Sequence, residues 1–197
     1  MTEKEKRDLN ILYDANNDPE LIKELMSCKK RCYEYNNLSP DDADKRKELL
    51  KSLVNIKGDV LIQSPFYCDY GYNIVLGNNF YANHNCVMLD GAKITFGDNV
   101  FVGPDCGFYT AGHPLDSKRR NAGLEYAYPI TVGDNVWFGG GVKVMPGVVI
   151  GNNVVIGSGS IVTKDIPDNV IAYGNPCRVI RELTEEDLNK EYIYRGR

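Results

Sequence analysis

Histidine and closely spaced cysteine pairs are scarce in this chain. Its 197 residues include two histidines and six cysteines, and no two cysteines have the CxxC spacing. Zinc sites are usually built from four His or Cys ligands that come in such close pairs. The sequence therefore predicts no metal site, and we interpret most of the cysteines as small apolar packing residues in a reducing compartment.

Long apolar runs are also missing. No stretch approaches the roughly 18 apolar residues that are needed to span a bilayer. The first ten residues, MTEKEKRDLN, are charged where a signal peptide would be apolar. The formal net charge of −4 argues against a general polyanion binder. We therefore expect a cytoplasmic protein that has neither a membrane nor a nucleic acid as its partner.

Glycine is absent from residues 1–56, which are rich in Lys, Glu, Leu and Asn and predict a helical region. We expect one helix through KEKRDLNILYDA. A second should begin with Asp18 as its N-cap and Pro19 as its first helical residue, and the sequence SPDD should open a third. Helices this short need a surface to pack on, so we expect them to lie against the rest of the chain or across a subunit contact.

A period of six residues governs the second half of the chain. Apolar residues occupy every sixth position, and glycine follows most of them, at Val132, Phe138, Val144, Ile150, Ile156 and Val162. This period matches neither a helix nor a free strand. It is typical of a hexapeptide-repeat β-solenoid, in which three hexads form one triangular coil. The same register occurs less cleanly earlier in the chain, at Leu76, Ala82, Met88 and Ile94 and, after a slip, at Phe96, Val102 and Phe108.

These patterns divide the chain into three parts. A solenoid is predicted over residues 57–182, between the helical region 1–56 and a C-terminal helix or tail over residues 183–197, with Thr184 as the helix cap. A polar loop at residues 109–129 interrupts the register. A loop this long inside a compact solenoid is usually functional or disordered, and a tolerated surface insertion is the alternative.

His113 lies in this loop, between Gly112 and Pro114. The pKa range of histidine suits a general base that acts on a hydroxyl, and a structural role is the alternative. We interpret His84, which lies on the solenoid, as structural. The sequence contains no nucleophile elbow, phosphate-binding loop or dinucleotide fingerprint. Direct transfer assisted by one base therefore fits better than covalent catalysis.

A basic cluster lies where the repeats end. It consists of Lys164, Arg178 and Arg181 in an otherwise acidic protein. Such a cluster suits a phosphorylated cofactor that lies along the solenoid wall. Ordinary solvated charges explain it equally well.

Several sequence blocks resemble the maltose/galactoside O-acetyltransferases, the sugar branch of the hexapeptide acyltransferases. The likeness covers roughly residues 5–183 and is carried by NFYAN, TAGHP, YPITVGDNVWFGGGVKVMPGVVIGNNVVIGSGSIVTKDIP and GNPCRVIRE. It implies a mainly β fold, a left-handed parallel β-helix, with the helical region before it and a short C-terminal helix. It also implies a sugar O-acetyltransferase that forms a homotrimer and binds acetyl-CoA between neighbouring subunits, with no metal required.

The resemblance further implies which residues act. His113 would take the proton from a sugar hydroxyl while the hydroxyl oxygen attacks the thioester of acetyl-CoA. The backbone amide of Gly140 would stabilise the oxyanion, and Asn83 would lie near the reacting groups. The positions expected to bind the acceptor are Asp14, Asp69, Tyr81, Asn83, Asp90 and Glu125, of which Glu125 could instead orient His113. The positions expected to bind acetyl-CoA are Trp137, Gly140, Ser158, Thr163, Lys164, Arg178 and Arg181.

Two departures weaken a galactoside assignment. Gly91 stands where that branch has an Asp, and Leu25 stands where it has an Arg. The segments LDGAK and GLEYAYP resemble the maltose branch more closely, which favours a glucose- or maltose-type acceptor. Two alternatives stay open: an acetyltransferase of the same fold that acts on an antibiotic or other xenobiotic, and a non-catalytic solenoid scaffold.

Overall fold

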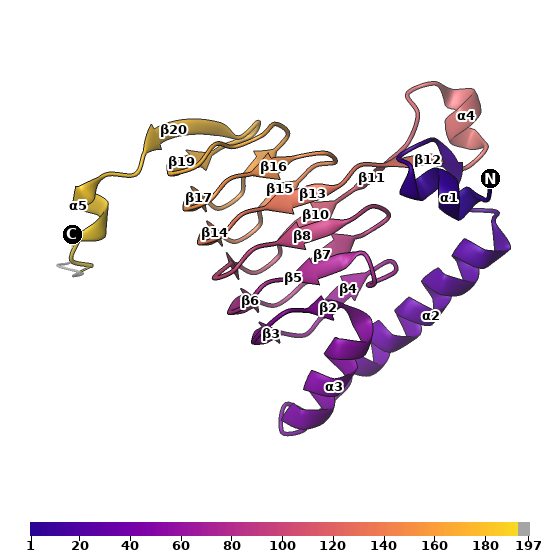
Figure 1. The fold of residues 1–197 in the computed structure, drawn as a ribbon, viewed down its shortest axis with the longest axis horizontal. Coiled ribbons are helices and arrows are strands. Elements are labelled where there is room, and N and C mark those ends of the chain that lie inside the picture. Colours follow the sequence, from indigo (N-terminus) through magenta and orange to yellow (C-terminus); the bar gives the residue numbers. More distant parts are fainter. Residues whose placement is uncertain (193–197) are drawn as a thin grey trace.

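Three parallel sheets form the walls of a β-helix in the computed structural model, which describes residues 1–192 (Figure 1). The first wall consists of β2 (Asn55–Ile56), β5 (Ile74–Leu76), β8 (Ile94–Phe96), β13 (Ile130–Val132) and β16 (Val149–Ile150). The second wall consists of β3 (Val60–Ile62), β6 (Phe80–Ala82), β9 (Phe101–Val102), β14 (Val136–Phe138), β17 (Val154–Ile156) and β19 (Val170–Tyr173). The third wall consists of β4 (Phe66–Cys68), β7 (Cys86–Leu89), β10 (Gly107–Tyr109), β15 (Lys143–Val144) and β18 (Ile161–Val162). The mainly β solenoid predicted from the six-residue period is confirmed.

The residues of the six-residue register form the core. Each predicted register position, from Leu76 to Val162, is at most 2% exposed. Phenylalanines stack edge to face through the centre, with ring centroids about 5 Å apart between Phe80, Phe96, Phe108 and Phe138. Burial of these side chains is the main favourable term for the fold, because each large apolar side chain removed from water contributes about 1.5–3 kcal/mol.

The corner between the first and second walls repeats almost without change, and we call it the asparagine corner. Each coil after the first turns there on an asparagine in the left-handed region, with φ between 54° and 60°, at Asn79, Asn99, Asn135, Asn153 and Asn169. The side-chain amides form a ladder, and Asn79 Nδ2 donates to Asn99 Oδ1 at 2.9 Å. Asparagine tolerates this conformation better than most residues with a Cβ, so the corner is a structural device.

The helices before the β-helix are only partly as predicted. The second helix is α2 (Pro19–Asn36), and the Asp18 side chain caps it by accepting from Leu21 N at 2.9 Å, as expected. The third is α3 (Ala43–Leu53). The single helix expected through KEKRDLNILYDA is wrong, because α1 (Glu3–Asp8) ends early and the chain turns at Asn10, with φ 57°, into β1 (Tyr13–Asp14).

The segment that follows the last coil also has regular structure as far as residue 188. β20 (Arg178–Glu182) pairs antiparallel with β19, and α5 (Glu185–Leu188) follows with Thr184 and Asp187 as a capping box, as predicted. The last five residues of the predicted C-terminal segment, 193–197, lie outside the described residues. No helix in the described part of the chain is long and apolar enough to cross a membrane.

The predicted loop at residues 109–129 protrudes from the β-helix and has its own structure (Figure 1). It contains β11 (Ala111–Gly112), α4 (Ser117–Asn121) and β12 (Leu124–Ala127). β12 pairs antiparallel with both β11 and β1, so the N-terminal segment and the loop form one small sheet. This sheet fixes the elements that carry the candidate base.

Candidate active site

His113 is held at the start of the protruding loop by the hairpin that β11 and β12 form. Its Nδ1 lies 3.0 Å from the carbonyl oxygen of Leu124. A carbonyl oxygen can only accept, so Nδ1 carries the hydrogen and Nε2 keeps its lone pair. The imidazole side chain is 48% exposed. It is therefore oriented by the backbone and can accept a proton at Nε2.

The carboxylate of Glu125 faces the Nε2 side of this imidazole, and Asp14 lies on the neighbouring strand. Glu125 Oε1 lies 3.8 Å from His113 Nε2, and the hydroxyl of Tyr13 donates to Glu125 Oε2 at 3.3 Å. Asp14 follows Tyr13 on β1 and is paired with Leu124 on β12. Its carboxylate accepts from the backbone amides of Asn16 and Asn17, so Asp14 also stabilises the turn beside the site.

A small cavity lies between this group and the third wall. It has a volume of about 100 Å³, and its lining includes Tyr13, Leu25, Asp69, Gly91 and Glu125. Burial raises the pKa of Asp69 to about 7, and the neighbouring charges of Asp90 and Glu125 act in the same direction. At neutral pH the Asp69 carboxyl can therefore either donate or accept a hydrogen bond, which suits the recognition of hydroxyl groups.

Asp90 has a supporting position in the same region. Its carboxylate accepts hydrogen bonds from the backbone amides of Asp69, Tyr70 and Gly71 at 2.7–2.9 Å. The side chain has no exposed surface, so the expected direct contact of Asp90 with an acceptor does not fit its position. Asp90 instead holds the turn that carries Asp69.

We call the corner between the third and first walls the loop corner, because the protruding loop with His113 leaves the β-helix there and Asp69 lies beside it. Asn83, Gly140 and Ser158 lie at the corner between the second and third walls, which we call the glycine corner. Among the described residues no acceptor is paired with the Gly140 amide, whereas the adjacent amides of Gly139 and Gly141 donate to Ile156 O and Pro104 O.

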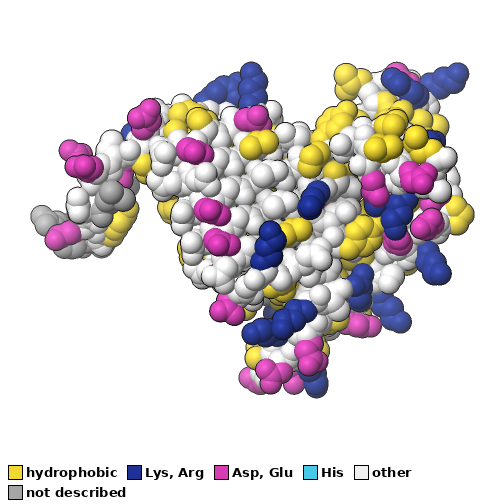
Figure 2. Space-filling view, in the orientation of Figure 1, with side chains coloured by type: hydrophobic (Ala, Val, Ile, Leu, Met, Phe, Trp, Pro, Cys, Tyr) yellow, Lys and Arg dark blue, Asp and Glu magenta, His cyan; other side chains and the backbone are white. Residues whose placement is uncertain are grey.

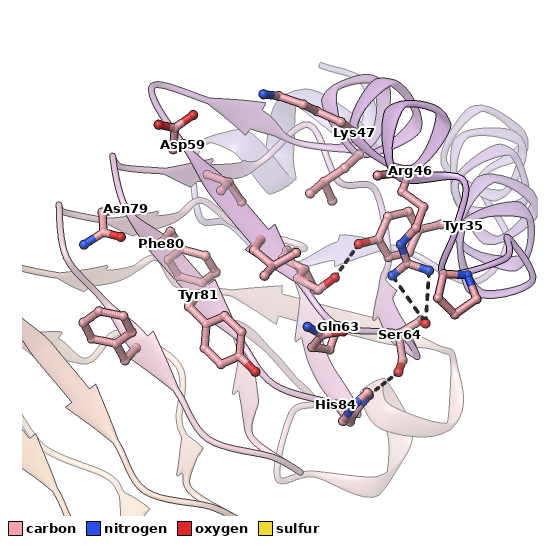
Figure 3. A pocket seen from close by; sticks show the side chains of 17 residues that line it. Tyr35, Arg46, Lys47, Asp59, Gln63, Ser64, Asn79, Phe80, Tyr81 and His84 are labelled. Carbon is pink, nitrogen blue, oxygen red and sulfur yellow. Dashed lines mark hydrogen bonds between the residues drawn. The ribbon is translucent and has the colours of Figure 1, made fainter.

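The second wall presents aromatic side chains to solvent. Trp137, on β14, is 56% exposed. Tyr81, on β6, lines a cavity of about 710 Å³ between this wall and α3 (Figure 3). In the same cavity, Arg46 donates to Ser64 Oγ, and His84 Nδ1 bonds with the carbonyl oxygen of Ser64. The hydrogen bond of His84 fits the structural role expected for it.

The residues expected to bind acetyl-CoA fall into separate groups. Thr163 and Lys164 are exposed at the loop corner, directly after β18. Arg178 is exposed on β20, where its Nη1 donates to the carbonyl oxygen of Cys177. Arg181 forms a two-point ion pair with Asp187, with N–O distances of 2.6 and 2.7 Å. Its guanidinium is already engaged by a carboxylate.

The structure thus separates the predicted site residues into two constellations. It brings together Asp14, Asp69, His113 and Glu125 at the loop corner, and it places Asn83, Gly140 and Ser158 at the glycine corner. These corners lie at opposite ends of the strands of the third wall. A four-residue strand such as β7 spans about 13 Å.

Two residues of the site were not predicted from the sequence. Leu124 supplies the carbonyl that orients His113, and Tyr13 contacts Glu125. A backbone carbonyl leaves no signal in the choice of side chain. Tyr13 was assigned to a helix, and its role depends on the pairing between β1 and β12, which are separated by more than 100 residues.

A β-helix of hexapeptide repeats with a histidine on a protruding loop defines this chain as a hexapeptide-repeat acyltransferase by class. Two family models match it: the maltose acetyltransferase hexapeptide capping motif over residues 11–58, and the bacterial transferase hexapeptide over residues 129–164. The chain belongs to the maltose/galactoside O-acetyltransferase family, as its sequence blocks indicated.

Individual relatives agree with this assignment. A putative acetyltransferase of Saccharomyces cerevisiae is 58% identical, and the match covers 89% of this chain and 90% of that protein. The crystal structure of a maltose O-acetyltransferase from Clostridium difficile is 50% identical with a TM-score of 0.91, covering 94% of this chain and 99% of the other. A galactoside acetyltransferase in complex with coenzyme A is 40% identical with a TM-score of 0.93, covering 99% and 97%.

Proposed function

We propose that this protein transfers the acetyl group of acetyl-CoA to a hydroxyl of a sugar, with a glucose- or maltose-type acceptor favoured. The observation that supports the proposal is the position of His113. Its Nδ1 is bonded to a backbone carbonyl, and its Nε2 lies 3.8 Å from Glu125, which lines a small cavity together with Asp69. This is the arrangement that a general base for a hydroxyl requires. The family and the relative in complex with coenzyme A support acetyl-CoA as the donor.

The reaction proceeds by direct transfer. His113 Nε2 takes the hydroxyl proton of the acceptor as the oxygen attacks the thioester carbon. The carbonyl oxygen then becomes an oxyanion, and the amide of Gly140 donates to it. When the tetrahedral intermediate collapses, the carbon–sulfur bond breaks and the imidazolium returns the proton to the thiolate of CoA.

Glu125 acts on the acceptor side of this reaction. The nitrogen that an orienting carboxylate would hold, Nδ1, is already bonded to Leu124 O. Glu125 instead lies 3.8 Å from Nε2. In that position it stabilises the imidazolium as it forms and accepts from the acceptor hydroxyls, together with Asp69.

The active site is shared between subunits of a homotrimer. The base and the oxyanion donor must both lie within about 3 Å of reacting atoms, yet His113 and Gly140 occupy opposite ends of the third wall. The loop corner of one copy and the glycine corner of the next supply the two halves. Hydrophobic side chains gathered over the protruding loop favour such packing (Figure 2), and Leu115 on this loop is 97% exposed.

Acetyl-CoA lies along the groove between these copies. Trp137 and Ser158 contact its pantetheine arm from the second wall and the glycine corner. Thr163, Lys164, Arg178 and Arg181 bind the phosphate end, where charge-assisted hydrogen bonds are strongest. Asn83 contacts the reacting groups, and Tyr81 lies near the acceptor.

The test is the release of free CoA thiol from acetyl-CoA in the presence of glucose, maltose, galactosides or antibiotics. We expect thiol release with glucose or maltose. His84→Ala is the matched control for His113→Ala, because it removes the other histidine while leaving the loop intact. Release with an antibiotic alone, or equal losses in the two variants, would contradict the proposal.

A further inference from the structure

Three cysteines that are dispersed in the sequence meet between α2 and the third wall. Cys28 and Cys32 are one helical turn apart on α2, so their side chains share a face. Cys68 is the last residue of β4. The Sγ atom of Cys68 lies 3.5 Å from that of Cys28 and 3.7 Å from that of Cys32, and all three residues are buried.

These separations match a set of ligands around one ion. With Zn–S bonds of about 2.3 Å and tetrahedral angles, thiolate sulfurs lie about 3.8 Å apart. All three Sγ atoms are within 4.8 Å of one another. A disulfide needs sulfur atoms about 2.05 Å apart, so the cluster fits shared coordination by three thiols better than a bond between two of them.

The three cysteines of the cluster are buried, so ionised sulfur there needs a partner of opposite charge. Three thiolates would carry three negative charges in a buried place, which is costly without a counterion. A divalent ion neutralises two of them.

A second feature gives this cluster an entry path. A cavity of about 360 Å³ reaches it, lined by residues that include Lys29, Cys32, Cys68 and Asp69. Zinc in proteins usually has four ligands. Water in the cavity can supply the fourth one.

We propose that Cys28, Cys32 and Cys68 bind a thiophilic divalent ion such as Zn²⁺ with three thiolates. Each thiol gives up its proton to solvent when the ion binds. The ion joins α2 to β4, directly before Asp69 and beside the cavity that Leu25 on α2 lines. The ion would therefore hold in place the cavity wall that carries Asp69. The metal site itself is independent of the identity of the acceptor.

The first test is metal content of the full-length protein. The protein is reduced, loaded with Zn²⁺ and separated from free ion by gel filtration. We expect about one zinc per chain in the wild type and in Cys177→Ser, and less than about a fifth of that in Cys32→Ser. Cys177 is the matched control because it is a buried cysteine outside the cluster. Equal zinc in all three proteins, or none in the wild type, would overturn the proposal.

A second measurement does not depend on the folding of any variant. Co²⁺ added to the reduced wild-type protein should produce the intense thiolate-to-cobalt charge-transfer absorption of a sulfur-rich site, and Zn²⁺ should abolish it. Zn²⁺ should also raise the melting temperature, because it binds the folded state. Weak absorption typical of oxygen ligands, or no change in melting temperature with Zn²⁺, would refute the site.

Discussion

The asparagine corner and the loop corner belong to the same β-helix but are built in opposite ways. At the asparagine corner five coils repeat one solution, a left-handed asparagine, and the side-chain amides of Asn79, Asn99 and Asn153 each donate to the asparagine of the next coil. At the loop corner the coils carry Asp69, Asp90, the protruding loop, Pro146 and Lys164 in turn, so no single type of turn repeats there. Repetition serves stability, and the proposed mechanism places the base and the acceptor site on the coils that break the repetition. The predictions below change one corner at a time.

The largest effect should come from the loop corner. We expect His113→Ala to lower the kcat of acetyl transfer by a factor of about 100 or more, because a general base contributes that much. Binding of acetyl-CoA, measured by calorimetry, should change little. Unchanged turnover would remove His113 from the mechanism.

The glycine corner should come next. Gly140→Pro removes the amide that donates to the oxyanion, and we expect kcat to fall by a factor of about 100. Gly140→Ala is the matched control, because it keeps the amide and its Cβ would meet Pro104 only at 3.4 Å. Steady-state kinetics would measure both variants. Similar losses of kcat would show that any side chain at this position is harmful, which would contradict a role for the amide.

A smaller effect is expected where the coils end. Arg178→Ala should raise the KM for acetyl-CoA by a factor of about 10, as expected for the loss of a charge-assisted hydrogen bond, and leave the KM for the sugar unchanged. Arg181→Ala should have less effect, because Asp187 already engages that guanidinium. Equal increases in both KM values would contradict the phosphate site at Arg178.

The smallest effect on activity should come from the asparagine corner. Asn135→Ala places alanine, which tolerates the left-handed region less well than asparagine, at φ 57° and removes the ladder bond from Asn99 Nδ2. We expect the free energy of unfolding to fall by about 2 kcal/mol, with kcat nearly unchanged. Asn135→Gly should cost less, because glycine adopts this conformation freely. Denaturation at one fixed protein concentration measures both, and a larger loss for Gly would be inconsistent with this account.

The repeat made the fold predictable. The register residues, of which Val132 and Phe138 are examples, point inward in every coil. The six-residue period in the sequence therefore identifies the core residues of the whole β-helix. The start of α2 was equally accessible, because Asp18 and Pro19 act locally. The extent of α1 was not, because the segment that ends in Tyr13 pairs with β12 across more than 100 residues.

The candidate site was predictable only in its side chains. His113 stood out because the loop breaks the register, but the carbonyl of Leu124 that orients it has no sequence signal. Asp90 matched an acceptor position in the family, and only its burial revealed that its carboxylate holds a turn. The meeting of Cys28, Cys32 and Cys68 could not be predicted from spacing, since it requires α2 to pack on β4.

The most direct test of the account is a mixing experiment with His113→Ala and Asn83→Ala, each of which we expect to lose most of its activity on its own. If one copy supplies the loop corner and its neighbour the glycine corner, some sites in a mixed trimer combine an intact His113 with an intact Asn83. Random assembly from equal amounts, after joint unfolding and refolding, should restore about a quarter of the wild-type rate. Mixtures that stay as inactive as the separate variants would show that both residues act from the same chain, which would contradict the shared site.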